Sequence, residues 1–231
     1  MKLYADLHIH TCLSPCGDDD MTPNDVIGMA KLKGLDVIAV TDHNSCLNLR
    51  AIEKIVEDED ELLVIPGLEV STMEDIHVLC YFPTFKQAYI FADVIYEHLT
   101  PFYNRDDIFG RQIIRDCKDE ENGTEKRLLI GTTDLEIATL AKLCREYGGV
   151  AVPAHINKQA NSVLVILGTI PDECGFNTVE IHRKTQMPDI DLSKYKIIYS
   201  SDAHSLGHIL EREFELEVEN RSIEAVLEAL K

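Results

Sequence analysis

Short apolar segments typical of β-strands alternate with segments of helical periodicity along most of this chain. Leu3–His10 alternates apolar and polar residues, whereas Leu35–Thr41 is a nearly continuous apolar run rich in β-branched residues. Between them, Thr22 can cap a helix that has Pro23 at its first position and ends at Gly34. Because strands separated by helices usually pair in parallel, this alternation predicts an α/β fold with a mostly parallel sheet.

The alternation continues along the chain with one interruption. Further strands are expected at Leu62–Ser71, Ile76–Phe82, Val150–His155, Thr178–His182, Lys196–Ser201 and Phe214–Val218, and further helices around Leu47–Glu59, at Asp134–Tyr147 and from Ser222 onward. Residues 85–133 break the rhythm, first with an aromatic helical stretch and then with a charged loop, and we interpret them as an insertion. About seven or eight strands in this order predict one barrel domain over residues 1–231, related to the eight-stranded β/α type.

Composition limits the classes of protein and of partner. The 22 basic and 41 acidic residues give a formal net charge of −19, which argues against an extended nucleic-acid-binding face. Small anionic substrates stay compatible with this charge, because bound divalent cations reverse the local field. The seven cysteines form no C-x-x-C pair, which favours a reducing compartment. The chain has neither a membrane-spanning apolar run nor a leader, so we expect a cytoplasmic protein without a membrane partner.

Histidines and carboxylates gather at the expected carboxyl ends of strands, where α/β folds bind their ligands. These residues are Asp6, His8, His10, Asp42, His43, Glu69, His155, Asp202 and His204, and His77 lies earlier on a neighbouring strand. Residues two apart on a strand share a face, so two imidazoles can bind one cation. A single histidine of this kind is more often a structural residue, but so many at strand ends predict a centre for Zn, Mn or Fe.

These motifs resemble those of the polymerase and histidinol phosphatase (PHP) superfamily. The resemblance rests on Asp6–Thr11, Thr41–Asn44, His155 and Ser201–His204, and it covers nearly the whole chain except residues 85–133. It implies a distorted (β/α)7 TIM-like barrel, two or three divalent metal ions and the hydrolysis of phosphoester bonds.

The resemblance also implies a set of metal ligands. The first ion would be bound by His8, His10, Glu69 and Asp202, the second by Glu69 with His77 and His155, and the third by His43 and His204 with a ligand from the loop after His10. Cys16 stands in that loop where relatives have a histidine, and a thiolate there would favour zinc or iron. The acidic run Asp18–Asp20 is the alternative source of this ligand.

Other residues are expected to support this centre. Asp6 and Asp42 would orient histidines by hydrogen bonds, although Asp42 has a turn cap as its alternative role. Asp202 and His204 can also handle the proton of the leaving group. Arg183 can clamp a phosphate, or it can be a solvated basic residue. His98 and His208 are expected to be structural, and His182 is expected to face solvent, with a ligand role as its alternative.

The leading hypothesis from the sequence is therefore a metal-dependent phosphoesterase that acts on a small phosphorylated molecule, such as a nucleotide or a sugar phosphate. A second hypothesis is a nuclease or DNA-end-processing enzyme. The sequence argues against it, because it contains no basic track and no aromatic stacking platform that would bind a nucleic acid. A third is a metal-binding regulatory module without turnover, and the presence of ligands at nearly every expected position argues against it.

Overall fold

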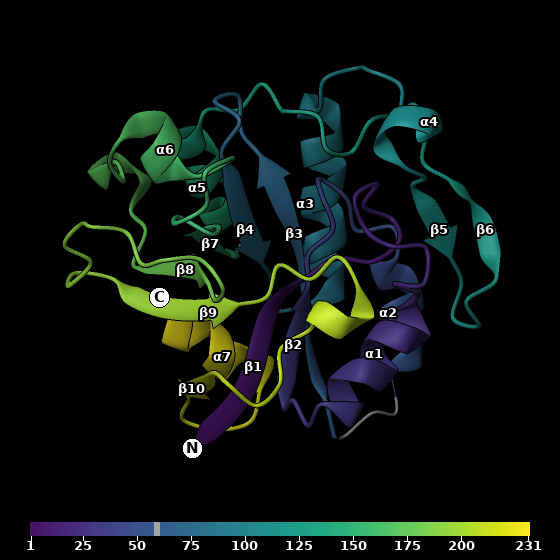
Figure 1. Ribbon diagram of the computed structural model, residues 1–231, viewed down its shortest axis with the longest axis horizontal. Coiled ribbons are helices and arrows are strands. Elements are labelled where there is room, and N and C mark those ends of the chain that lie inside the picture. Colours follow the sequence, from purple (N-terminus) through teal and green to yellow (C-terminus); the bar gives the residue numbers. More distant parts are fainter. Residues whose placement is uncertain (58–60) are drawn as a thin grey trace.

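The protein has a mixed α/β fold, described here from a computed structural model for residues 1–57 and 61–231 (Figure 1). The central sheet has six strands in the order β10-β1-β2-β3-β4-β7. Its strands are β1 (Lys2–Ile9), β2 (Val37–Val40), β3 (Leu63–Ser71), β4 (His77–Tyr81), β7 (Val150–Pro153) and β10 (Glu215–Glu217). The expected α/β class is thus confirmed.

Two further strands, β8 (Thr178–His182) and β9 (Lys196–Ser200), form a parallel pair. Strand β8 lies next to β7 at one side of the sheet, and β9 lies next to β1 at the other. The amide of Ile156, three residues after β7, donates to the carbonyl of Glu180 within β8, 3.0 Å away. On the other side, Ile9 and Ala203 form a parallel bridge that joins β1 to the segment after β9. The sheet therefore curls into a half-barrel (Figure 1).

The described helices lie mostly on the outside of this sheet. They are α1 (Pro23–Leu32), α2 (Leu49–Ile55), α3 (Phe85–His98), α4 (Asp106–Phe109), α5 (Ile137–Glu146), α6 (Val163–Leu167) and α7 (Ile223–Leu230). Thr22 caps α1 as expected, since its hydroxyl accepts a hydrogen bond from the amide of Asp25. The end of the helix expected around Leu47–Glu59 lies outside the described residues. Within residues 1–57 and 61–231, no helix combines the length and the apolar character needed to cross a membrane.

Strand β4 runs opposite to the direction that the sequence led us to expect. It pairs antiparallel with both β3 and β7, and β10 pairs antiparallel with β1. The prediction of a mostly parallel sheet is wrong at these strands, because the connection at residues 72–76 is too short for a crossover helix and forms a hairpin. The reversal places His77, the first residue of β4, opposite Ser71 at the carboxyl end of β3.

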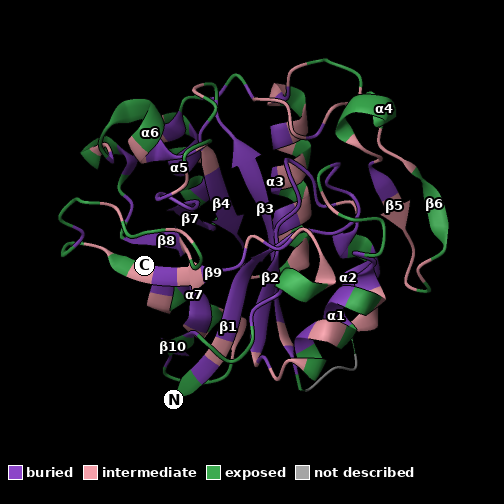
Figure 2. Ribbon diagram, in the orientation of Figure 1, coloured by how far each residue is buried: buried purple, intermediate pink, exposed green. Residues whose placement is uncertain are grey.

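The segment at residues 85–133 divides into two parts. Its first part, α3, buries Ala88, Phe91 and Ile95 against the core and belongs to the helical layer. The rest contains α4 and a hairpin of β5 (Ile113–Arg115) and β6 (Glu121–Thr124), which lies at one side of the molecule. Figure 2 shows α4 and β6 largely exposed, whereas the central strands are buried.

Candidate metal centre

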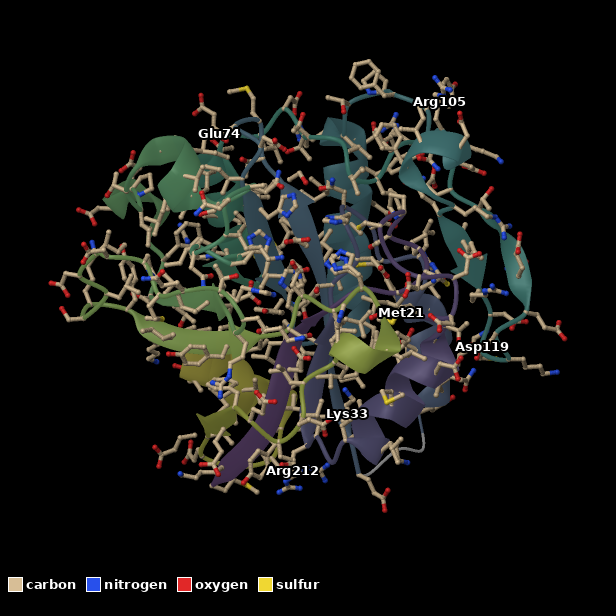
Figure 3. All side chains as sticks on the ribbon, in the orientation of Figure 1. Met21, Lys33, Glu74, Arg105, Asp119 and Arg212 are labelled. Carbon is tan, nitrogen blue, oxygen red and sulfur yellow. The ribbon has the colours of Figure 1, made fainter. Side chains whose placement is uncertain are left out.

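Side chains from the carboxyl ends of β1, β2, β3 and β7, the start of β4 and the loop after β9 converge on one site. Six of them line a cavity of about 220 Å³, namely His43, Glu69, His77, His155, Asp202 and His204. His8 and His10 lie buried beneath it, in contact with Glu69 and Asp202. In Figure 3 side-chain nitrogens gather there, while the labelled Lys33 and Arg212 lie at the opposite end of β1.

The deepest group consists of two histidines and two carboxylates. The Nε2 atoms of His8 and His10 are 3.1 Å apart. Asp202 Oδ1 lies 3.3 Å from the first of these nitrogens and 3.2 Å from the second. Glu69 brings Oε1 to 3.3 Å from His8 Nε2 and Oε2 to 3.4 Å from His10 Nε2. Four donor side chains therefore surround one point, as the ligands of a tetrahedral cation do.

The other ring nitrogens fix the tautomers of both histidines. His8 Nδ1 lies 3.0 Å from a carboxylate oxygen of Glu180, so it carries a proton. His10 Nδ1 contacts Ser14 Oγ at 2.9 Å, and that hydroxyl donates its own proton to Asp42 Oδ1 at 2.7 Å. His10 Nδ1 must therefore donate as well. The lone pairs of the two Nε2 atoms then face each other, an arrangement that a cation between them would stabilise.

The pKa shifts of His8, His10 and Glu69 also show how the site favours positive charge. Burial alone would lower the pKa of His8, but the surrounding carboxylates raise it well above its usual value. Burial, helped by His204, lowers the pKa of His10 to about 4. Burial would raise the pKa of Glu69, but His77 and other imidazoles hold it well below its usual value. The low pKa values keep His10 neutral and Glu69 ionised, which are the forms that bind metal ions, whereas the raised pKa of His8 favours a proton that a metal ion would have to displace.

A second group surrounds the same glutamate. Glu69 Oε1 lies 2.9 Å from His77 Nδ1 and 3.2 Å from His155 Nε2, and Oε2 lies 3.0 Å from His43 Nδ1. The buried Nδ1 atoms of His43 and His77 and the Oε2 atom of Glu69 form no hydrogen bond despite these short approaches. Such geometry fits ligands around a shared cation. The expected pair of His77 and His155 is thus brought together, and His43 joins them.

The expected third group is only partly assembled. Donor atoms of His43, His204 and His10 lie within 4.8 Å of one another. Cys16, expected as a further ligand, belongs to none of the groups of possible metal ligands found among the described residues, and its side chain is exposed. The surrounding protein atoms nevertheless desolvate its sulfur, and this effect, followed by the charges of Glu69 and Asp202, raises the pKa of the thiol. The acidic run after Cys16 has exposed side chains.

The two supporting aspartates act on the centre indirectly, Asp42 through Ser14 and Asp6 through the loop after β9. Asp42 accepts hydrogen bonds from the Thr11 amide and hydroxyl, both at 2.7 Å, and reaches His10 only through Ser14. Asp6 contacts no ring nitrogen among the described residues. It accepts from the amide of Ser201 at 3.1 Å and from its hydroxyl at 2.6 Å, and so holds the loop that presents the candidate ligand Asp202. Burial raises the pKa of Asp6 to about 6.

Glu180 is a supporting residue that the sequence analysis missed. Its buried carboxylate accepts hydrogen bonds from His8 Nδ1 and from the His155 amide, the latter at 2.6 Å. It therefore orients two candidate ligands from different strands. A signal was present in the sequence, since Glu180 is a charged residue between the apolar Val179 and Ile181 of a buried strand.

Of the basic residues near the strand ends, Lys158 lies in the site and Arg183 does not. Lys158 lines the cavity, and its ammonium group pairs with Asp202 Oδ2. The Arg183 guanidinium pairs instead with Glu213 at 3.3 Å and lies over the Tyr199 ring. The structure thus does not bring the expected phosphate clamp to the cluster. His98 pairs with Asp134 and His208 lies in a short 3-10 turn, both apart from the cluster. His182 lies nearer, since burial and then the charge of Lys158 lower its pKa, but its Nδ1 contacts Thr185 Oγ1 at 2.8 Å.

Backbone strain is concentrated at this site. His155 has a φ of 27° and Asp202 a φ of 50°, and Asn44, which follows His43, has a φ of 49°. Residues other than glycine adopt this left-handed backbone conformation at a cost of roughly 1–3 kcal/mol each. The conformation persists only where surrounding contacts enforce it. The hydrogen bond from the His155 amide to Glu180 is one such contact. The fold therefore holds two candidate ligands in conformations that local preference disfavours.

We expect Ser14→Ala to weaken metal binding by about 10- to 100-fold. The change removes the oxygen that accepts from His10 Nδ1 and the donor to Asp42 Oδ1, so the ring of His10 loses its fixed orientation. Competition with a chromophoric chelator measures the affinity. Ser193→Ala, at an exposed position, is the control. Equal affinities of the wild type and Ser14→Ala would contradict the proposed hydrogen-bond relay.

Comparison with known families identifies the chain. Residues 6–165 match the family model described as PHP domain. The chain belongs to the PHP family. The family resemblance inferred from the strand-end motifs is therefore confirmed, and PHP membership supports a hydrolase that acts on phosphoester bonds.

Two curated relatives come from Methanocaldococcus jannaschii, and both are named as uncharacterized proteins. MJ1587 is 37% identical over 80 residues, which cover 31% of this chain and 46% of the relative. MJ0043 is 25% identical over 155 residues, which cover 67% of this chain and 16% of the relative. The chain thus spans less than half the length of these relatives.

Solved structures share the fold of this PHP chain. The lesion-specific endonuclease PfuEndoQ from Pyrococcus furiosus has a TM-score of 0.72 at 22% identity, covering 100% of this chain and 56% of that one. Endonuclease Q in complex with a 27-mer duplex has a TM-score of 0.74 at 22% identity, with the same coverage. A protein described as a metal-dependent phosphoesterase from Bifidobacterium adolescentis has a TM-score of 0.61 at 15% identity, covering 98% and 94%.

These structures correct the expected partner. From the net charge we expected a small phosphorylated substrate and no extended nucleic-acid binding. In the Endonuclease Q complex, however, a chain of the same fold binds a duplex that has an abasic lesion at the active site. The expectation is wrong as an inference from charge, because net charge averages the whole surface and does not decide what one edge of the barrel binds.

Proposed function

We propose that this PHP protein is a metal-dependent phosphoesterase. The observation that carries the proposal is the close approach of His8 Nε2 and His10 Nε2 at 3.1 Å, with Glu69 and Asp202 beside both. These four residues would bind one cation. His43, His77 and His155 would bind a second through Glu69, and His204 would contribute to a third. We further propose that the half-barrel is a distorted (β/α)7 barrel, in which β10 stands outside the ring.

The donor set fits Zn, Mn or Fe, because imidazole and carboxylate ligands dominate it. Such ions supply an activated water and offset the charge that develops on phosphoryl oxygens. The residues of the chain have separate tasks. Asp42 orients His10 through Ser14, as its hydrogen bonds indicate. His204 lines the cavity with Nδ1 bonded to the Asp202 carbonyl at 2.8 Å, which leaves the Nε2 lone pair available as a ligand for the third cation.

For the substrate class we propose a phosphodiester in DNA at a damaged position. The support is the fold likeness to Endonuclease Q, which extends over 100% of this chain. A non-catalytic metal-binding module is the alternative from a different class. The cavity with a basic side chain beside the candidate ligands favours catalysis over it.

A substrate panel tests the proposal. Protein loaded with Mn or Zn is incubated with a duplex that has one abasic site, the same duplex undamaged, an aryl phosphate diester and an aryl phosphate monoester. We expect cleavage of the abasic duplex and of the aryl diester, and at most slow cleavage of the undamaged duplex. Hydrolysis of the monoester alone would contradict the proposed substrate class. No turnover of any substrate by metal-loaded protein would favour the non-catalytic module.

Lys158→Met is expected to lower kcat/KM by about 10- to 100-fold while metal content stays the same. Lys158 is a half-buried cation at the edge of the cavity, and its charge can bind a phosphoryl oxygen of the substrate. Steady-state kinetics and metal analysis give the two readouts, and Lys158→Arg should restore part of the activity. Lys142→Met, on the surface of α5, is the control. Loss of metal from Lys158→Met would instead indicate a structural role.

A further inference from the structure

A second cavity, of about 250 Å³, lies between α2 and α3. Its walls include Arg50, Tyr89, Ala92, Asp93, Tyr96 and Glu125, and we call it the tyrosine slot. Its floor is formed by residues 44–47, the segment that follows the candidate ligand His43. None of the side chains that line the metal-centre cavity lines the tyrosine slot.

Two aromatic rings line the tyrosine slot, and a small residue lies between them along α3. Tyr89 and Tyr96 lie two turns apart on α3, which separates their backbones by about 10 Å along the helix. Within residues 1–57 and 61–231, no ring contact joins them. Ala92 fills little of the gap. A ring stacked on both tyrosines, with its centre about 4.5–7 Å from each of theirs, requires the two tyrosine rings to be about 9–14 Å apart. The spacing of the two residues along α3 is compatible with one such ring.

The two tyrosines are held in place before any ligand binds. The Arg50 guanidinium lies 4.7 Å from the centre of the Tyr89 ring, and the Tyr89 hydroxyl donates to Glu53 at 2.8 Å. Arg127 lies 4.3 Å from the centre of the Tyr96 ring, whose hydroxyl donates to Glu125 at 3.2 Å. A rigid pair of rings loses little conformational entropy on binding.

Two opposite charges in the tyrosine slot lack protein partners. In the described part of the chain, the exposed Asp93 carboxylate forms no hydrogen bond or ion pair. The guanidinium of Arg50, also exposed, contacts Tyr89 but pairs with no carboxylate there. A carboxylate accepts two adjacent donors, and a guanidinium offers two adjacent donors. Guanine carries both complements, since its N1–H and amino group donate while O6 and N7 accept.

We propose that the tyrosine slot binds a guanine base. The base stacks between Tyr89 and Tyr96, its donor edge faces Asp93, and its acceptor edge faces Arg50. A free guanine nucleoside and a guanine in single-stranded nucleic acid both present this base, so either can be the ligand. This site does not depend on the proposed phosphoesterase activity, because it uses no residue of the metal centre.

Isothermal titration of the full chain with guanosine tests the slot. We expect saturable binding of one guanosine per chain and binding of adenosine weaker by about tenfold or more. Ala92→Leu, which fills the gap between the rings, should remove binding. Asp93→Asn should weaken it by about tenfold. Glu97→Gln, on the same helix but outside the tyrosine slot, should bind guanosine like the wild type.

Further arms separate this proposal from the others. The metal-centre variant Asp202→Asn should still bind guanosine, so failure of the phosphoesterase proposal leaves this test intact. Displacement of guanosine by a thymidine oligonucleotide with one guanine would identify nucleic acid as the source, and no displacement would identify the free nucleoside. The proposal is overturned if guanosine does not bind, if adenosine binds equally well, or if folded Ala92→Leu, judged by its melting temperature, binds guanosine unchanged.

Discussion

Glu69→Gln is expected to reduce phosphoester hydrolysis by about a thousandfold and to lower the number of metal ions bound per chain. The two oxygens of Glu69 lie within 3.4 Å of nitrogens from five histidines, which come from several elements of the fold. Glutamine keeps the shape of the side chain but loses the negative charge that these ligands share. The effect is large because the charge of Glu69 is buried, and among the described residues no other carboxylate pairs with His43 or His77.

The measurements for Glu69→Gln are kcat/KM on the best substrate of the panel and metal content by mass spectrometry. Glu146→Gln makes the same change at an exposed position of α5 and should leave both values unchanged. A Glu69→Gln protein that keeps full metal content and activity would show that the glutamate is a structural residue.

Glu180→Gln is expected to weaken metal binding by about 10- to 100-fold, although no metal would contact this residue. The carboxylate accepts from His8 Nδ1 and from the His155 amide, so it sets the basicity of one candidate ligand and the strained backbone of another. The amide of glutamine supplies one acceptor oxygen and no charge. We expect a loss of unfolding free energy of about 1–3 kcal/mol as well, because a buried partner is left without its ion pair.

Chelator competition and denaturant unfolding test Glu180→Gln. Glu173→Gln, on an exposed 3-10 turn, serves as the control. An unchanged metal affinity together with lower stability would mean that Glu180 supports the fold and not the metal centre.

The strands and most of the cluster were predictable because they depend on local patterns. Alternation places His8 and His10 on one face of β1, and the carboxyl ends of parallel strands share an edge. Asp202 follows β9 and Glu69 lies near the end of β3, so both reach the same edge. These contacts follow from strand ends alone, without knowledge of the helices.

The direction of β4 was not predicted, although the sequence contained the signal. The pattern at Ile76–Phe82 identified a strand, but a pattern of apolar residues is the same in both directions. The short connection at residues 72–76 was the indication of a hairpin. His77 was nevertheless placed with the cluster, because the family resemblance implied it.

Contacts between distant segments were the hardest to predict. Glu180 pairs with His8 across 172 positions, and Lys158 reaches Asp202 across 44. No local pattern relates such pairs, because strand order and loop conformation decide them. Arg183 was chosen because it follows a strand, and Cys16 because relatives have a histidine at its place. The structure places Arg183 beside Glu213 and leaves Cys16 exposed.

The most direct test of the central claim is anomalous diffraction from crystals of the protein loaded with Mn or Zn. We predict an anomalous peak between His8 and His10, about 2.1 Å from their Nε2 atoms and close to oxygens of Glu69 and Asp202. A second peak is expected between Glu69 and His77. Well-diffracting crystals grown in the presence of the metal that show no anomalous peak among these side chains would contradict the account.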